Sequence, residues 1–92
     1  MSKKFRASHI LVPHEYEALD ILRKLKEGKS FEEMAMKFSK CPSSAKGGSL
    51  GEIPFGKADS DFEEAISILK PGEMTTKPVR TKFGYHIIKR EG

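Results

Sequence analysis

The chain has 92 residues, 37% of them hydrophobic and 33% charged, with one cysteine and a formal net charge of +4 at pH 7. This length predicts a single domain over residues 1–92, and the composition excludes an intrinsically disordered chain. One cysteine excludes an intrachain disulfide, and no signal peptide or membrane-length apolar run is apparent. We therefore expect a soluble, cytoplasmic protein, and we predict that it is a monomer.

The first part of the chain is typical of one strand followed by two helices. FRASHILV (5–12) predicts a strand that ends at Pro13, because proline supplies no donor to a β-ladder. Apolar residues at helical spacing then predict a helix in EYEALDILRKLKEG (15–28). A second helix is predicted to start at Ser30, where Ser30 and Glu33 form a capping-box pattern.

The second part is typical of a loop, three strands and a further helix. CPSSAKGG (41–48) predicts a loop that can hold one helical turn. DFEEAISILK (61–70) predicts a helix whose capping box is formed by Ser60 and Glu63. The strands are predicted in SLGEI (49–53), TKPVR (76–80, an edge strand because of its proline) and KFGYHIIKR (82–90). This mixed order indicates an α+β domain with a small sheet covered by helices.

Two of the predicted strands, one near each end of the chain, carry a histidine, His9 and His86. Two imidazoles side by side in a sheet can share one hydrogen bond that fixes the tautomer of each ring, a purely structural role. A zinc site made of His9, His86 and Cys41 is a second interpretation, without local ligand spacing to support it. A Cys–His nucleophilic pair is a third, although no nucleophile signature surrounds Cys41.

Five stretches of the sequence match one known pattern, and together they span almost the whole chain. They are SHILV (8–12), SKCPSSAKGGSLGEI (39–53), FEEAI (62–66), PGE (71–73) and FGYHIIK (83–89). In this order they closely resemble the parvulin family of peptidyl-prolyl cis–trans isomerases. The resemblance implies a four-stranded antiparallel sheet surrounded by four helices, in the order βαααβαββ, with the short fourth helix in CPSSAK.

The resemblance also implies an activity and a set of site residues. The chain is expected to accelerate rotation about X-Pro bonds of proline-containing polypeptides, without a cofactor or a metal. The expected catalytic residues are the paired histidines His9 and His86 at the centre of the sheet, Cys41 beside the bound peptide, and Thr81, whose hydroxyl bonds near the histidines. The expected substrate-binding residues, which receive the proline ring or border its cleft, are Leu50, Ile53, Ala58, Phe62 and Phe83.

The expected chemistry needs no bond to break. Twisting a peptide bond crosses a barrier of roughly 18–20 kcal/mol, so a catalyst has only to bind the twisted amide better than the planar ones. Because the planar amide is the more polar form, an apolar pocket favours the twisted one. Since the family also carries Asp at the position of Cys41, we interpret Cys41 as a polar neighbour and not as a nucleophile.

The chain departs from the family at three places. Phospho-specific parvulins carry a basic cluster after the first strand, whereas PHEYE (13–17) holds two glutamates and no Lys or Arg. We therefore expect no phosphate preference. Ala58 stands where methionine is frequent, and Ile53 where many members have an aromatic residue. These two positions keep open an alternative function as a peptide-binding, chaperone-like module with low turnover.

The net positive charge favours a basic surface patch over a nucleic-acid-binding site. No aromatic platform and no known nucleic-acid-binding motif accompanies the basic residues. If the first and last strands are antiparallel neighbours, basic residues near both ends of the chain lie close together. A second group surrounds the end of the first predicted helix. We expect weak attachment to an anionic membrane surface through Lys3, Lys4, Arg6, Lys89 and Arg90, or through Arg23, Lys24, Lys26 and Lys29.

Overall fold

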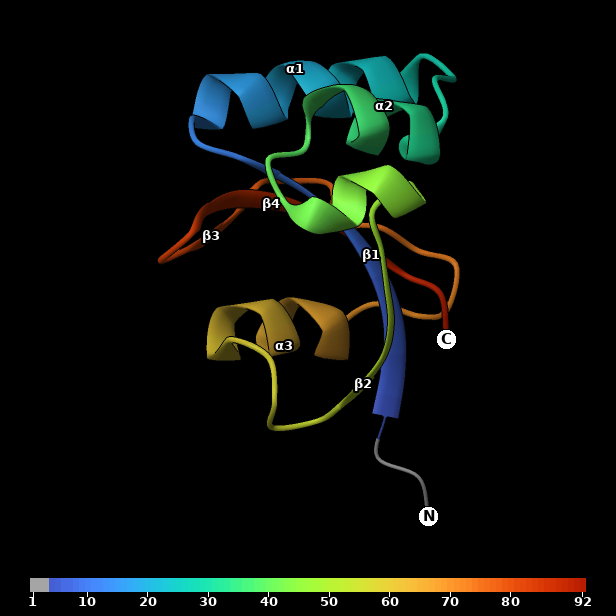
Figure 1. Ribbon diagram of the computed structural model, residues 1–92, viewed down its shortest axis with the longest axis vertical. Helices are drawn as coiled ribbons and strands as arrows, with labels where there is room; N and C mark the ends of the chain where they lie inside the picture. The colour runs from blue at the N-terminus through green and yellow to red at the C-terminus, as the bar shows by residue number, and fades with distance from the viewer. Residues whose placement is uncertain (1–3) are drawn as a thin grey trace.

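The computed structural model describes residues 4–92 as one sheet with helices on both of its faces (Figure 1). The sheet has the order β2-β1-β4-β3, and each neighbouring pair of strands is antiparallel. The predicted α+β class and four-stranded sheet are confirmed, with three α-helices and one 3₁₀ helix. The elements are β1 (Lys4–Val12), α1 (Glu15–Lys26), α2 (Phe31–Phe38), the 3₁₀ helix η1 (Pro42–Lys46), β2 (Ser49–Pro54), α3 (Ser60–Ser67), β3 (Val79–Thr81) and β4 (Gly84–Arg90).

Strand β1 supplies side chains to two hydrophobic cores, because successive residues of a strand face opposite sides of the sheet. Ile10 and Val12 are buried against α1 and α2 on one side, together with Ile87 of β4. Phe5 and Ala7 are buried on the other side, where α3 packs. Helices α1 and α2 thus cover one face and α3 covers the other, as Figure 1 shows.

The two predicted capping boxes have different outcomes. Ser30 caps α2 as expected, since its hydroxyl oxygen accepts a hydrogen bond from the Glu33 N–H at 3.3 Å. The box predicted for α3 is wrong: Asp59 is the N-cap, and its carboxylate accepts from the Asp61 N–H at 3.0 Å. A charged carboxylate is a stronger acceptor than a hydroxyl at the positive end of a helix.

The last third of the chain differs from its predicted bounds. The edge strand starts at Val79, after Pro78. The segment before Pro78 contacts β4 through hydrogen bonds of Thr75 and is not part of this strand. There the Thr75 N–H donates to the Ile88 carbonyl at 2.8 Å, and the Ile88 N–H donates to the Thr75 hydroxyl at 3.1 Å. Helix α3 ends at Ser67 and not at residue 70.

We predict that Gly48→Ala destabilises the fold by more than about 2 kcal/mol, because it combines strain with a clash. Gly48 has a φ of +89°, and an added Cβ would lie 2.6 Å from the His9 carbonyl oxygen. Gly51→Ala is the control, since Gly51 also has a positive φ, +71°, but open space around it. Urea unfolding measures both variants, and equal losses of stability would contradict the clash.

Candidate active site

The centre of the sheet holds a pair of buried histidines. The register of β1 against β4 places Leu11 opposite His86 and His9 opposite Ile88. The two histidines are therefore diagonal neighbours on the face that α3 covers, and their Nδ1 atoms lie 2.9 Å apart. The side-by-side imidazoles expected from the sequence are thus present, with exposed fractions of 5% and 4%.

Thr81 extends this pair into a hydrogen-bonded chain. Its hydroxyl lies 2.7 Å from Nε2 of His86 and accepts a hydrogen bond from the Phe83 N–H at 3.1 Å. The Thr81 hydrogen is then available to His86 Nε2, which leaves an Nδ1–H of His86 to donate to His9. Nε2 of His9 is buried and has no hydrogen-bond partner among residues 4–92. In this arrangement both rings are neutral and each fixes the tautomer of the other.

The surroundings favour neutral imidazoles. Burial, and to a smaller extent the charge of a protonated His86, lower the pKa of His9 from 6.5 to about 4. Burial also lowers the pKa of His86, although the nearby Asp59 carboxylate opposes this effect. Both histidines are therefore uncharged at neutral pH, a state suited to hydrogen bonding and not to carrying a charge.

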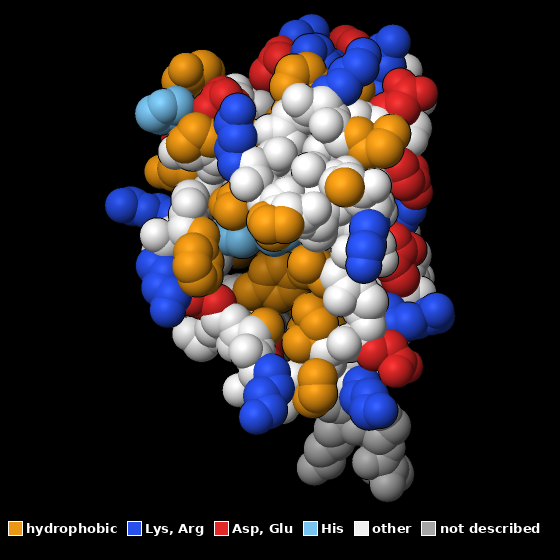
Figure 2. Space-filling view, viewed as in Figure 1, with side chains coloured by type: hydrophobic (Ala, Val, Ile, Leu, Met, Phe, Trp, Pro, Cys, Tyr) orange, Lys and Arg blue, Asp and Glu red, His pale blue; other side chains and the backbone are white. Residues whose placement is uncertain are grey.

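An apolar pocket of about 360 Å³ lies over the histidine pair. Figure 2 shows it as a central hollow with hydrophobic side chains around it and histidine at its floor. Phe62 from α3 forms one wall, with its ring edge-to-face against both imidazoles at centroid distances of 5.8 and 5.7 Å. The lining residues are His9, Leu11, Lys40, Cys41, Pro42, Leu50, Ile53, Ala58, Asp59, Phe62, Phe83 and His86.

The structure therefore brings the predicted site residues together. Eight of the nine line this pocket, and Thr81 contacts it through His86. The sequence analysis missed Leu11, which lies two residues after His9 and so on the same face of β1, a signal the strand period contained. It also missed Asp59, whose place in the pocket depends on how α3 docks.

Cys41 reaches the pocket because the segment before it is tied to the end of β1. The Leu11 N–H donates to the Ser39 hydroxyl at 3.0 Å, and the Lys40 N–H donates to the Leu11 carbonyl at 2.8 Å. Pro42 then opens η1, where its missing N–H costs no hydrogen bond, with Cys41 as the N-cap. The thiol consequently borders the pocket beside Leu11.

Known proteins are similar to this chain in both sequence and fold. A family model described as Rotamase: PPIC-type PPIASE domain matches residues 9–92. NmPin, the parvulin of Nitrosopumilus maritimus, is 44% identical in its solution structure, covers 100% of this chain and 99% of its own, and has a TM-score of 0.84. The chain belongs to the parvulin family.

This parvulin matches the PPIC-type PPIase domain over nearly its whole length, in agreement with the family resemblance of its sequence. The foldase protein PrsA of Caldanaerobacter subterraneus subsp. tengcongensis is 48% identical over 88 residues, 95% of this chain but 28% of the relative. The crystal structure of PrsA from Bacillus subtilis has a TM-score of 0.92 at 44% identity, and covers 98% of this chain and 35% of that one. The parvulin chain thus spans about three tenths of the curated relatives' length, 28% and 30% for the first two.

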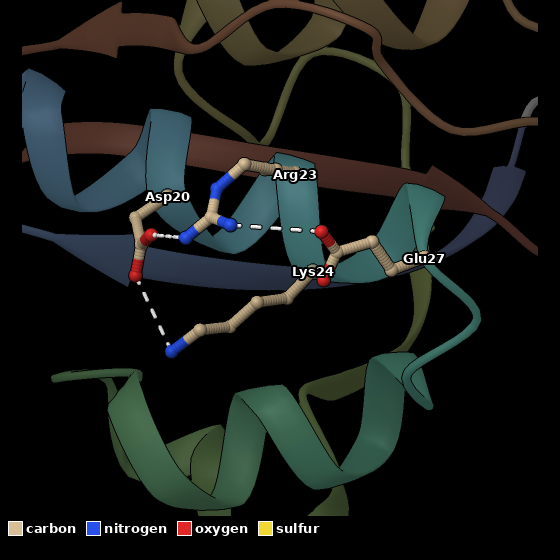
Figure 3. Close-up of polar contacts among 4 residues, drawn as sticks. All are labelled: Asp20, Arg23, Lys24 and Glu27. Atoms are coloured by element: carbon tan, nitrogen blue, oxygen red, sulfur yellow. Dashed lines mark hydrogen bonds and ion pairs between the residues drawn. The ribbon is translucent and has the colours of Figure 1, made fainter.

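Several basic residues in the described part of the chain are engaged with other groups of the protein. On α1, Arg23 pairs with Asp20 and Glu27, and Lys24 pairs with Asp20 at 3.3 Å (Figure 3). Lys89 faces the α2 side, where its Nζ lies 5.9 Å from the centre of the Phe31 ring. The Arg90 guanidinium instead donates to carbonyls at the end of α3, at 3.4 and 2.9 Å. Lys3, which the sequence analysis grouped with them, lies outside the described residues.

Two further observations concern the part of the chain that the structure describes. No helix in residues 4–92 has the length and apolar character that crossing a membrane requires. No group of three histidine, cysteine or acidic side chains within these residues is placed to hold a metal ion.

The lowered pKa of His9 predicts that stability falls in acid. The unfolded chain binds a proton near the usual pKa of 6.5, whereas the folded chain resists protonation until about 4. Stability is therefore complete above pH 6.5 and is lost between these values, by at most about 3 kcal/mol for this ring. Urea unfolding from pH 7 to 4 measures the slope.

Variants at two histidines separate this effect from general acid sensitivity. His9→Gln should flatten the slope, because the titrating ring is gone. His14→Gln removes an exposed histidine and should leave the slope unchanged. An unaltered slope in His9→Gln would show that other groups cause the loss of stability.

Proposed function

We propose that the pocket over the histidine pair binds the proline ring of an X-Pro substrate and that this parvulin twists the adjoining amide non-covalently. The observation that carries the proposal is an apolar pocket of about 360 Å³ whose floor is a neutral, hydrogen-bonded histidine pair. Such a pocket accepts a small apolar ring and excludes water from the neighbouring amide. No group in it has to form a covalent bond with the substrate.

The physical basis is a difference in polarity between the planar and the twisted amide. Resonance makes the planar amide more polar and gives it a barrier of roughly 18–20 kcal/mol. Walls such as Leu50 and Phe62 solvate the planar form poorly, so they stabilise the twisted form relative to it. His9, His86 and Thr81 keep the floor rigid, and Cys41 serves as a polar neighbour of the rotating carbonyl.

We predict that Leu50→Ala lowers kcat/KM on a short X-Pro peptide by about tenfold, because a wall of the pocket is shortened. Leu19→Ala is the matched control, since Leu19 lies on α1, is 51% exposed and does not line this pocket. A protease-free isomerisation assay measures both variants. Equal activities in the two variants would contradict the pocket as the substrate site. Low turnover in the unaltered chain would instead support the peptide-binding alternative.

The proposal includes the absence of a phosphate preference. A second cleft, of about 640 Å³, shares Phe83 with the pocket and is lined by residues 13–16, at the start of α1, and by the hairpin of β3 and β4. Glu15 lines this cleft, but Arg80 and Lys82 do too, and these two make no ion pair within residues 4–92. The other acidic residue in the first turn of α1, Glu17, lines a different groove. One acidic and two basic side chains therefore line this cleft, so the repulsion that Glu15 exerts on a phosphate is opposed by Arg80 and Lys82.

We predict that a Ser-Pro peptide and its phosphorylated form differ in kcat/KM by less than about threefold, because Glu15 opposes the two basic residues and salt screens the remaining charge of an open cleft. Glu15→Gln should favour the phosphorylated peptide, and Arg80→Gln should disfavour it. The ratio of kcat/KM for the phosphorylated and the unphosphorylated peptide is measured at low and at physiological salt, because only the electrostatic contribution to this ratio depends on salt. A tenfold gain on phosphorylation in the unaltered chain would refute the proposal.

Cytoplasmic location, a monomeric state and peripheral attachment to an anionic membrane surface also stay predictions. The ion pairs on α1 reduce the charge that Arg23 and Lys24 can offer to lipid, and Arg90 is engaged with backbone carbonyls. Attachment would therefore depend mainly on residues outside these contacts, such as Lys26 and Lys29. Each such residue contributes about 1 kcal/mol near an anionic surface at low salt.

A further inference from the structure

One wall of the pocket is a loop with little burial of its own. Residues 55–59 connect β2 to α3, and Ala58 and Asp59 line the pocket. Gly56 and Lys57 are exposed, and Phe55 is 41% exposed although its ring lies 4.9 Å from that of Phe5. Apolar contacts therefore hold this loop at few points, and an additional anchor is needed for a fixed wall.

The Glu63 carboxylate provides that anchor. One of its oxygens, Oε2, accepts hydrogen bonds from the Gly56 N–H at 2.6 Å and from the Ala58 N–H at 3.1 Å. Hydrogen bonds to an ionised acceptor are about twice as strong as neutral ones. Glu63 directly follows Phe62 on α3, so these bonds fix the wall at Ala58 relative to the wall at Phe62.

The alternative role for Glu63, in capping its own helix, does not account for these contacts. A capping box would direct the carboxylate to the N–H of the N-cap residue, whereas Asp59 caps α3 and Glu63 bonds to the loop beyond it. The next residue, Glu64, is exposed, and its carboxylate makes no hydrogen bond or ion pair within residues 4–92. The two adjacent glutamates thus carry the same side chain, but only Glu63 contacts the loop.

We infer that Glu63 is a positioning residue of this isomerase. It holds the Ala58 wall closed on the proline ring, so that the ring stays fixed while the preceding carbonyl rotates. The inference rests on the proposed function, because it takes the pocket as the proline site. If the wall is closed for only a fraction of the time, the apparent Kd for substrate equals the intrinsic Kd divided by that fraction. Loss of the anchor is therefore expected to raise KM more than it lowers kcat.

The test compares three variants on a short X-Pro peptide. Glu63→Ala should lower kcat/KM by roughly tenfold, mainly through KM, because the wall must order when substrate binds. Glu63→Gln keeps an oxygen that can accept both bonds and should recover kcat/KM to within about threefold. Glu64→Ala removes the same charge without the loop contact and should stay within about twofold of the unaltered chain. If Glu63→Ala does not fold, Glu63→Asp, too short to reach both amides, replaces it.

Amide hydrogen exchange gives a readout independent of activity. In Glu63→Ala, exchange should accelerate at Gly56 and Ala58 but not at His9 or His86, and in Glu64→Ala it should not change. Faster exchange with an unchanged KM would overturn the inference, because the wall would then be loose without consequence for binding. Equal losses of activity in Glu63→Ala and Glu64→Ala would overturn it as well. Failure of the pocket itself shows separately, as undiminished activity in Leu50→Ala.

Discussion

The pairing of β1 with β4 is the constraint on which the rest of the structure depends. It joins residues far apart in the chain: His9 and His86 are separated by 77 positions and meet at 2.9 Å. Because side chains alternate along a strand, a shift of register by one residue would move one imidazole to the opposite face. The two cores on either side of the sheet make such a shift of β1 costly, since Phe5 and Ile10 would both leave their apolar surroundings.

The site combines a polar floor with apolar walls. Three polar side chains lie below the pocket, yet they bond mainly to one another, so their groups do not draw water into the hollow. Burial keeps both imidazoles neutral, so the pair itself places no net charge beneath the pocket. An environment of this kind suits a reaction whose transition state is less polar than its ground state, and it needs neither a nucleophile nor a proton donor.

The walls of the pocket differ in how they are held. Phe62 and Leu11 come from packed elements, whereas the wall at Ala58 belongs to an exposed loop tied by the Glu63 carboxylate. A small domain has a limited hydrophobic core. Hydrogen bonds between the loop and the helix that follows it stabilise the loop without additional apolar burial.

The sequence by itself determined the amphipathic helices, the Ser30 cap, the strand positions of both histidines and the family resemblance that named the site residues. These features depend on residues a few positions apart, where propensity and periodicity act directly. Only the tertiary structure decided that Asp59 and not Ser60 caps α3, that Glu63 bonds to the preceding loop, and that Arg90 bonds to carbonyls at the end of α3. In each case several partners were chemically equivalent, and the choice among them depended on which segments long-range packing brought within hydrogen-bonding distance.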